Sequence, residues 1–534
     1  GDSFFGFTIA DASTDVIAQD EDGDALTPSG TAVNGTTTPT NVVTLADSGT
    51  LAVSVGSGTP SADFVLAPST GNSVAVFRLT ATNEDFNVET LTFSEEQGED
   101  DSGTADSTVY TNNVSTVTIS YPLADDTTAT KSVSMSGNEA RFSLTGADKL
   151  FVGVGEPADV TVKVNVPMTD RDAGGSATSN EKIRLGLFVD TTNDDNFKAV
   201  GVGSGTTFDD DDQAAIGDDG VATDGIHTFV VRETKPTVTL SSLSPSGGAV
   251  VGRSEVLRFN VAASSNEDVV LEEVIFSLSS TDIGGGNWNQ CYTDLSTGIT
   301  PADFDFYNLT DDGTSTTLDL DSDTDENDSL AEMAASTDSP WTGLQATGAI
   351  CGTTGADVTF VRLDLPSSEV IPKNTTKTFA LYFDSTGASA SSDDSIRFDL
   401  AADPILASGS FLTASDLTES NVTTTDTTIS VTSGALYVIG DVLCMATDDA
   451  TCSAAHEKML VTGISTNDLT VVRGYLNTVP DSGSLNDAGD DLDRMPSSLL
   501  WKDDGVSGIA GSSDDFWGSY LVDNMTVSGG TLSF

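Results

Sequence analysis

The chain has 534 residues, 83 of them acidic and 21 basic, and a formal net charge of −62. This charge excludes a nucleic-acid backbone or an anionic lipid surface as the natural partner and favours cations. Calcium among the carboxylates and adaptation to high salt are both hypotheses at this point. Hydrophobic residues make up 37% of the sequence and are grouped in alternating runs, which predicts folded β modules. None of these runs approaches the ~18 apolar residues of a membrane span.

Residues 1–48 are predicted to form an apolar strand on a flexible acidic leash. A polar stretch rich in Asp, Gly, Thr and Pro follows the strand and is too polar to make a core of its own. Such a strand either packs within its own chain or adds to the sheet of a neighbouring subunit. The candidate assembly strand consists of Phe4, Phe5, Phe7 and Ile9.

Two similar stretches, at residues 74–94 and 255–278, indicate that the chain is built from repeats. Each leads from one alternating run through an Asn-Glu-Asp corner, at residues 83–85 and 266–268, into a second alternating run. The predicted fold is all-β, with tandem Ig-like β-sandwich modules and a smaller β-rich C-terminal domain. The predicted boundaries are 1–48 for the strand and leash, 49–233 for repeat 1, 234–426 for repeat 2 with a long insertion at 279–357, and 427–534 for the C-terminal domain.

Four cysteines fall as two pairs, Cys291 with Cys351 near the ends of the insertion and Cys444 with Cys452 in the C-terminal domain. Their spacing lacks the Cys-x-x-Cys pattern of a zinc site, so two disulfides are predicted, with buried free thiols as the alternative. Disulfides place the protein in an oxidising compartment, outside the cell or on its surface. The one helix predicted is short and spans residues 329–335.

Calcium is the predicted cofactor, and the sharpest candidate loop is residues 321–332. Its oxygen-bearing residues follow EF-hand spacing, but Glu326 replaces the glycine that permits the sharp turn, so a calcium loop of another type is predicted, with a solvated acidic loop as the alternative. The candidate ligands there are Asp321, Asp323, Asp325, Asn327 and Glu332. Three further acidic clusters are candidates, namely Asp190, Asn193, Asp194 and Asp195; Asp20, Asp22 and Asp24; and residues 209–212 with Asp218 and Asp219. The Asn-Glu-Asp corners either bind calcium or accept hydrogen bonds from backbone amides at a turn.

Three stretches, LRFNVAASSNEDVVLEEVIF, KTFALYFDSTGASASSDDSIRFDL and SLLWKDDG…FWGSYLVDNMTVSG, resemble the large secreted, surface-layer-like proteins of candidate phyla radiation bacteria of the Parcubacteria type. The resemblance covers roughly residues 49–534 and consists of strand-and-turn repeats. It implies a protein that assembles at the cell surface or outside the cell, and it supplies no catalytic residues.

The catalytic inventory is poor. His227 and His456 are the two histidines, and neither lies in a recognisable catalytic motif. We therefore predict a non-enzymatic structural protein that self-assembles as a homo-polymer into a surface layer or filament, with calcium in its acidic loops.

The alternative is an extracellular adhesin or carbohydrate-binding protein, with a cell-envelope glycan as the partner. It requires Trp501, Trp517 and Tyr520 to be exposed in a concave site. A secreted hydrolase is a third reading and needs a carboxylate pair in a deep cleft.

Overall fold

The computed structural model shows an all-β protein, as predicted. The residues that it describes are 3–5, 18–19, 25–26, 43–45, 49–95, 112–169, 174–189, 196–209, 212, 226–243, 251–281, 304–310, 344–346, 358–385, 395–401, 412–416, 422, 426–434, 437, 439–446, 456–478, 491–503 and 516–533. Apart from two three-residue 3₁₀ helices, η1 (Gly146–Asp148) and η5 (Tyr475–Asn477), the regular elements among these residues are strands.

The first sandwich packs two antiparallel sheets around one core. One sheet has the order β10-β9-β13-β7-β5, made from β5 (Thr50–Val55), β7 (Ser69–Thr82), β9 (Thr116–Pro122), β10 (Thr128–Ser134) and β13 (Ala158–Val166). The facing sheet contains β8 (Phe86–Glu95), β11 (Glu139–Ser143), β12 (Leu150–Val152), β15 (Leu185–Leu187), β16 (Lys198–Gly201) and β17 (Thr207–Asp209). Alternation drives the packing: every second side chain of β13, including Val160, Val162 and Val164, is fully buried.

A small three-stranded sheet lies where the first sandwich meets the rest of the molecule. Its order is β14-β18-β6, from β14 (Lys182–Ile183), β18 (Phe229–Arg232) and β6 (Phe64–Leu66), and the β18–β6 pairing is parallel. Phe64 of β6 is buried in the core of the second sandwich, whereas the adjacent Val65 is buried in the core of the first. The alternating side chains of one strand therefore serve two cores.

The second sandwich repeats the strand order of the first. Its sheet β19-β20-β25-β22 corresponds to β5-β7-β13-β9 and is made from β19 (Pro236–Leu240), β20 (Arg253–Ala263), β22 (Phe304–Asn308) and β25 (Thr376–Asp384). The facing sheet has the order β23-β24-β21-β26-β35, from β21 (Val269–Thr281), β23 (Leu344–Ala346), β24 (Val358–Ile371), β26 (Ser395–Leu400) and β35 (Val527–Ser528). Because β22 is an integral strand, part of the stretch predicted as an insertion, 279–357, belongs to the sandwich itself; the predicted helix at 329–335 lies outside the described residues.

A third unit is inserted into the second sandwich. It is a six-stranded antiparallel sheet of order β27-β32-β29-β30-β31-β28, from β27 (Leu412–Asp416), β28 (Thr428–Ser430), β29 (Asp441–Ala446), β30 (Lys458–Ser465), β31 (Asp468–Val472) and β32 (Asp491–Pro496). The chain then returns to the second sandwich: β33 (Leu499–Asp503) pairs with β21, β34 (Phe516–Trp517) pairs with β33, and β36 (Leu532–Ser533) pairs with β26.

The predicted C-terminal domain, 427–534, is therefore wrong as one unit. Its last strands bury Leu499 and Trp501 against β21, whose edge they complete, and the third unit begins earlier, at β27. A strand can extend the edge of a sheet, and bury its apolar side chains there, even when it lies far away along the chain.

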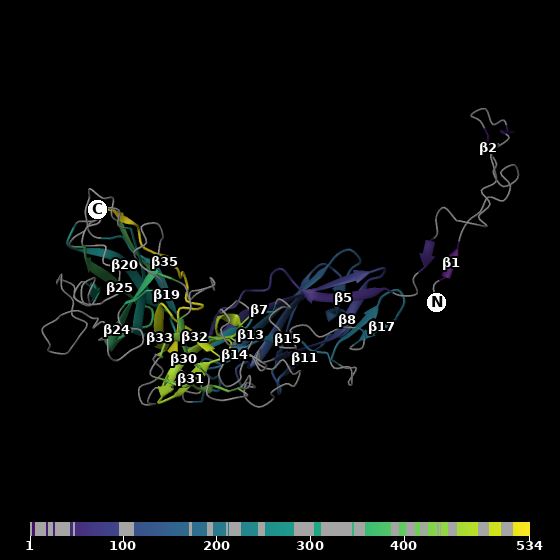
Figure 1. Ribbon diagram of the computed structural model, residues 1–534. Helices are drawn as coiled ribbons and strands as arrows, with labels where there is room; N and C mark the ends of the chain where they lie inside the picture. Colours follow the sequence, from purple (N-terminus) through teal and green to yellow (C-terminus); the bar gives the residue numbers. More distant parts are fainter. Residues whose placement is uncertain are drawn as a thin grey trace.

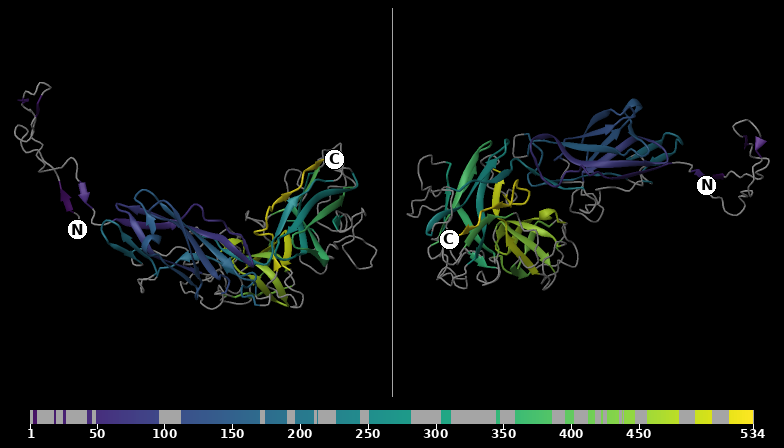
Figure 2. Two further views of the ribbon diagram at one scale, coloured as in Figure 1. Left: turned by 180° about the vertical axis from the view of Figure 1, so that it is seen from behind. Right: turned by 90° about the horizontal axis from the view of Figure 1, so that it is seen from above.

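The molecule is elongated (Figures 1 and 2). The first sandwich follows the N-terminal strands, and the second sandwich lies at the opposite end with the C-terminus. Two small two-stranded sheets, β1 (Ser3–Phe5) with β4 (Val43–Leu45) and β2 (Ala18–Gln19) with β3 (Ala25–Leu26), lie beyond the far end of the first sandwich.

Candidate functional site

Apart from Asp209 and Asp212, the predicted calcium ligands lie outside the described residues. This holds for the loop candidates Asp321, Asp323, Asp325, Asn327 and Glu332, and for the clusters Asp190, Asn193, Asp194, Asp195 and Asp20, Asp22, Asp24. Within the described ranges no group of three or more His, Cys, Asp or Glu side chains is placed to hold a metal ion. Calcium binding therefore stays a prediction from the sequence.

The candidate assembly strand pairs within its own chain. In β1, Phe4 lies opposite Thr44 and Phe5 opposite Val43 of β4, whereas Phe7 and Ile9 lie outside the described residues. Pairing with β4 satisfies one edge of this short strand and leaves the exchange of β1 between subunits untested.

One cysteine of the predicted pairs is described. Cys444 is fully buried in β29 and is disulfide-bonded. Cys291, Cys351 and Cys452 lie outside the described residues, so the predicted pairings stay predictions.

The first Asn-Glu-Asp corner uses its carboxylates as acceptors for backbone amides. Glu84 accepts hydrogen bonds from the Gly49 N–H at 2.7 Å, the Ser204 N–H at 2.8 Å and the Gly203 N–H at 3.0 Å, and also from the Ser204 hydroxyl. These donors, that of Gly49 foremost, lower the pKa of Glu84 to about 2. A Cβ on Gly49 would lie 2.5 Å from Cγ of Glu84, so the tight approach requires glycine there.

The second corner repeats one of these contacts. Asp85 of the first corner accepts a hydrogen bond from the Val154 N–H at 2.8 Å, and Asp268 of the second accepts one from the Lys373 N–H at 2.7 Å. Both donors follow the strand, β12 or β24, that pairs with the strand after the corner. Both corners thus act as backbone acceptors, which is the second of the two alternatives drawn from the sequence.

The aromatic residues of the C-terminal segment lie in a buried junction instead of an exposed platform. Trp501 is fully buried, Trp517 is 1% exposed, and each indole N–H donates to a backbone carbonyl, at 2.9 and 2.8 Å. Phe64 of the first sandwich contacts both indoles edge-on, with ring centroids 5.7 Å apart in each case. Tyr475 of the third unit makes edge-to-face contacts with Trp517 and Tyr520, so all three units meet at this cluster.

A buried ion pair closes the same junction. Arg232 of β18 lies 3.0 Å from the carboxylate of Asp503 of β33, both side chains are fully buried, and the guanidinium lies 4.5 Å from the ring centroid of Trp501. Asp503 also accepts hydrogen bonds from the Glu233 N–H at 2.9 Å and the Ser179 hydroxyl at 3.2 Å. This buried, hydrogen-bonded pair links β18 of the first sandwich's edge directly to β33 of the second sandwich.

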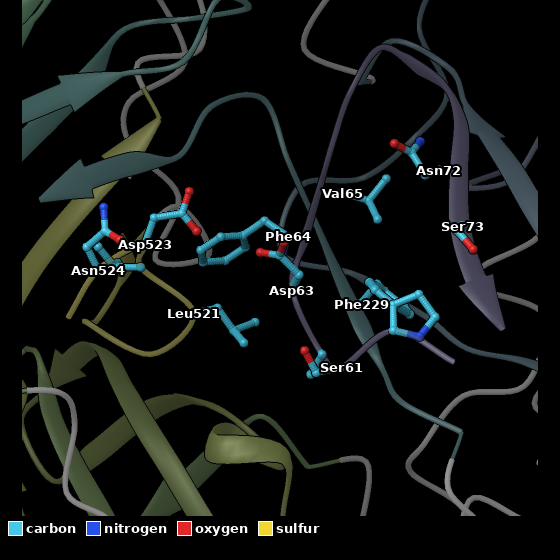
Figure 3. A pocket seen from close by; sticks show the side chains of 13 residues that line it. Ser61, Asp63, Phe64, Val65, Asn72, Ser73, Phe229, Leu521, Asp523 and Asn524 are labelled. Carbon is cyan, nitrogen blue, oxygen red and sulfur yellow. The ribbon is translucent and has the colours of Figure 1, made fainter. Parts of the chain in front are cut away.

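Beside the junction lies a pocket of about 460 Å³ between β6, β7 and the turn before β35 (Figure 3). Asp63 and Phe64 lie between Ser73 on one side and Leu521 and Asp523 on the other (Figure 3). Lys235 bridges the two carboxylates, at 3.2 Å from Asp63 and 3.2 Å from Asp523. The charged groups at this pocket are engaged in ion pairs that link the two sandwiches.

Glu95 at the end of β8 is a buried carboxyl of a different kind. It is 4% exposed, and neither of its side-chain oxygens has a hydrogen-bond partner among the described residues. Burial first, and the neighbouring charge of Glu181 second, raise the pKa of Glu95 to about 8. Its place at the end of an alternating strand gave no signal of burial in the sequence.

No family model and no curated protein matches the chain. Among solved structures, the CupB6 tip adhesin from Pseudomonas aeruginosa is 12% identical over 65% of this chain and 94% of its own, with a TM-score of 0.18. A protein described as membrane anchored from Corynebacterium diphtheriae is 9% identical over 66% of this chain and 91% of its own, with a TM-score of 0.11. Likeness at these scores carries no argument about function.

No helix among the described residues is long and apolar enough to cross a membrane.

Proposed function

We propose that the protein is a non-enzymatic structural component of the cell surface or extracellular space, and that it self-assembles into a surface layer or filament. The observation that carries the proposal is the buried junction between the two sandwiches. Arg232 and Asp503 form a fully buried pair, and Phe64 is held between two buried indoles. A fixed joint between elongated modules sets a spacing, which is what a repeating assembly requires and a flexible tether does not supply.

Charge supports the same proposal. With a net charge of −62, copies of the chain repel one another until cations neutralise the facing carboxylates. Calcium in the acidic loops is the cation that we propose for subunit contacts, and β1 is the strand that we propose for exchange between subunits.

The adhesin alternative has lost its main argument. Trp501 and Trp517 are at most 1% exposed, so they offer no stacking surface to a sugar ring. We therefore rank carbohydrate binding below assembly.

Electron microscopy and sedimentation of the purified protein, with calcium or with a chelator, test the proposal. We expect ordered polymers with calcium and monomers with the chelator in low salt. A protein that stays monomeric at high concentration with calcium, in both low and high salt, overturns the assembly proposal.

Deleting residues 1–17 tests strand exchange separately. If β1 is exchanged, the truncated protein stays folded and no longer polymerises. The control is Phe4→Thr with Phe5→Thr, which keeps the length and removes the apolar side chains. Polymers that form unchanged from both variants would eliminate strand exchange and leave calcium contacts as the basis of assembly.

A further inference from the structure

Three polar side chains meet inside the second sandwich. Lys377 of β25 and Asn308 of β22 both donate hydrogen bonds to the same oxygen, Oε1 of Glu369, and the bond from Asn308 Nδ2 is 3.0 Å long. Asn308 is fully buried, and the side chains of Glu369 and Lys377 are 11% and 12% exposed. An amine, a primary amide and a carboxylate thus share one largely desolvated site.

The strand register brings these groups together from two sheets. Asn308 lies directly opposite Phe379, and Lys377 is two residues before Phe379, so both side chains occupy the same inner face. Glu369 reaches them from β24 of the facing sheet. The carboxylate therefore contacts both the amine and the amide from across the core, while their strands, β22 and β25, stay paired with each other.

The surroundings suit an attack on the amide carbon. Phe306 and Phe379 stack beside the site with ring centroids 5.6 Å apart, and Phe259 stacks on both. The side-chain oxygen of Asn308, Oδ1, accepts a hydrogen bond from the Thr310 N–H at 2.9 Å. A donor on this oxygen stabilises the negative charge that develops there when a nucleophile adds to Cγ, and apolar walls strengthen that effect.

The first sandwich provides an internal comparison for these three positions. The repeats align on Asp85 with Asp268 at the corners and on Phe77 with Phe259 in the paired strands, and the strand registers then fix the partners. The corresponding residues are Ala158 for Lys377, Tyr121 for Asn308 and Leu150 for Glu369. All three are core residues, at most 3% exposed. The fold therefore accepts two aliphatic side chains and a tyrosine at these positions, and the amine, amide and carboxylate of the second sandwich call for a chemical reason.

We propose that Lys377 and Asn308 join in an amide bond between their side chains, formed by the protein itself. Glu369 takes a proton from the Lys377 ammonium, and the amine then attacks Cγ of Asn308, forming the new C–N bond. The charge on Oδ1 is held by the Thr310 N–H.

Collapse of this adduct breaks the bond from Cγ to Nδ2. Glu369 passes a proton to the leaving nitrogen and accepts the one released by the new amide. The overall change converts an ammonium and a primary amide into a secondary amide and an ammonium ion, with no oxidation or reduction and no co-reactant. Positioning by the two sheets supplies the effective concentration that the uncatalysed reaction lacks. This proposal concerns the second sandwich alone and does not depend on assembly.

Mass spectrometry of the full-length, reduced and denatured protein tests the bond. The wild-type protein is expected to be lighter than its sequence by one ammonia, about 17 Da. Because a succinimide at Asn34-Gly35 causes the same loss, the bond must also be located. Cleavage before aspartate releases peptides 305–310 and 364–383, which we expect to find as one cross-linked species in the wild type.

The control variants separate the bond from an ion pair. Lys377→Arg keeps a cation beside Glu369 and Glu369→Gln keeps the shape of the site; each is expected to yield the two peptides separately, with the fold checked by circular dichroism. Separate peptides 305–310 and 364–383 from the folded wild-type protein would overturn the proposal whatever the variants do. A cross-link that persists in Lys377→Arg would also overturn the assignment to Lys377.

Discussion

The two sandwiches share strand order and corner contacts but differ in what fills their centres. In both, the corner aspartate, Asp85 or Asp268, accepts a hydrogen bond from the backbone that follows the neighbouring strand. At the centre, the first has an aliphatic residue where the second has Glu369. Register and turn contacts thus define the repeat, whereas the chemistry of the core varies as long as the space between the sheets is filled.

The sandwiches also differ in how their sheets are completed. The strands of the first come from one continuous part of the chain, residues 50–232, whereas the second takes β33, β35 and β36 from beyond the third unit. Long-range completion of this kind makes the second sandwich dependent on the C-terminal segment.

The largest expected loss of stability comes from placing a carboxylate in the core of the first sandwich, at the position that corresponds to Glu369. Leu150→Glu buries a carboxylate without the amine and amide that surround Glu369, at a cost of about 5 kcal/mol in the free energy of unfolding. Urea denaturation followed by circular dichroism measures it. Leu150→Met, which keeps the volume, should cost less than about 1.5 kcal/mol. Equal stabilities for the two variants would mean that the centres of the sandwiches are interchangeable.

The second largest loss of stability is expected at the junction, where side chains of the two sandwiches pack against each other. Arg232→Ala leaves the carboxylate of Asp503 buried without its cation and should lower the free energy of unfolding by about 3–5 kcal/mol. The matched control is Arg78→Ala, which removes an Arg–Asp pair with Asp159 whose side chains are 40% and 44% exposed, and should change little. If both variants unfold at the same denaturant concentration, the junction does not join the modules rigidly.

Glu95 predicts a pH effect confined to the first sandwich. Because burial raises its pKa from 4.5 to about 8, the folded state holds the proton more tightly, and its stability should fall as pH rises from 4.5 to about 8. Glu95→Gln should match the wild type below pH 4.5 and exceed it by roughly 2–4 kcal/mol above pH 8. Denaturation curves at pH 4, 6 and 9 check this, and parallel profiles for the two proteins would show that folding does not raise the pKa of Glu95.

The smallest effect should be the same in both sandwiches. Asp85→Ala and Asp268→Ala each remove one hydrogen bond to a backbone amide, which is worth about 1 kcal/mol. Thermal unfolding should show two similar shifts. A loss in one sandwich several times that in the other would mean that the corners are not equivalent.

The sequence predicted the repeat because its signals are local. Period-2 runs fix which side chains of a strand point inward, and the Asn-Glu-Asp corners mark where strands turn. The return of the C-terminal segment was not predictable from pattern, since β35 and β36 have two residues each and show no periodicity. Their partners lie in β26, on the far side of an intervening unit.

The site residues were likewise only partly predictable from the sequence. Lys377 falls on the inward face of its strand with Phe379 and Leu381, and a charged residue at such a position is a detectable signal. Nothing in the sequence pairs it with Asn308 or Glu369, because that contact depends on three strands in two sheets. The burial of Trp501 was likewise hidden, since Phe64, which covers it, belongs to another module.

The inserted third unit has a mechanical consequence. The chain enters it after β26 and leaves it into β33, and both strands are hydrogen-bonded to β21 of the second sandwich. A direct path of paired strands therefore runs through the second sandwich beside the third unit. The third unit is nevertheless tied to this path, because its Tyr475 contacts Trp517 and Tyr520 and its Val442 and Leu460 are buried in the same core.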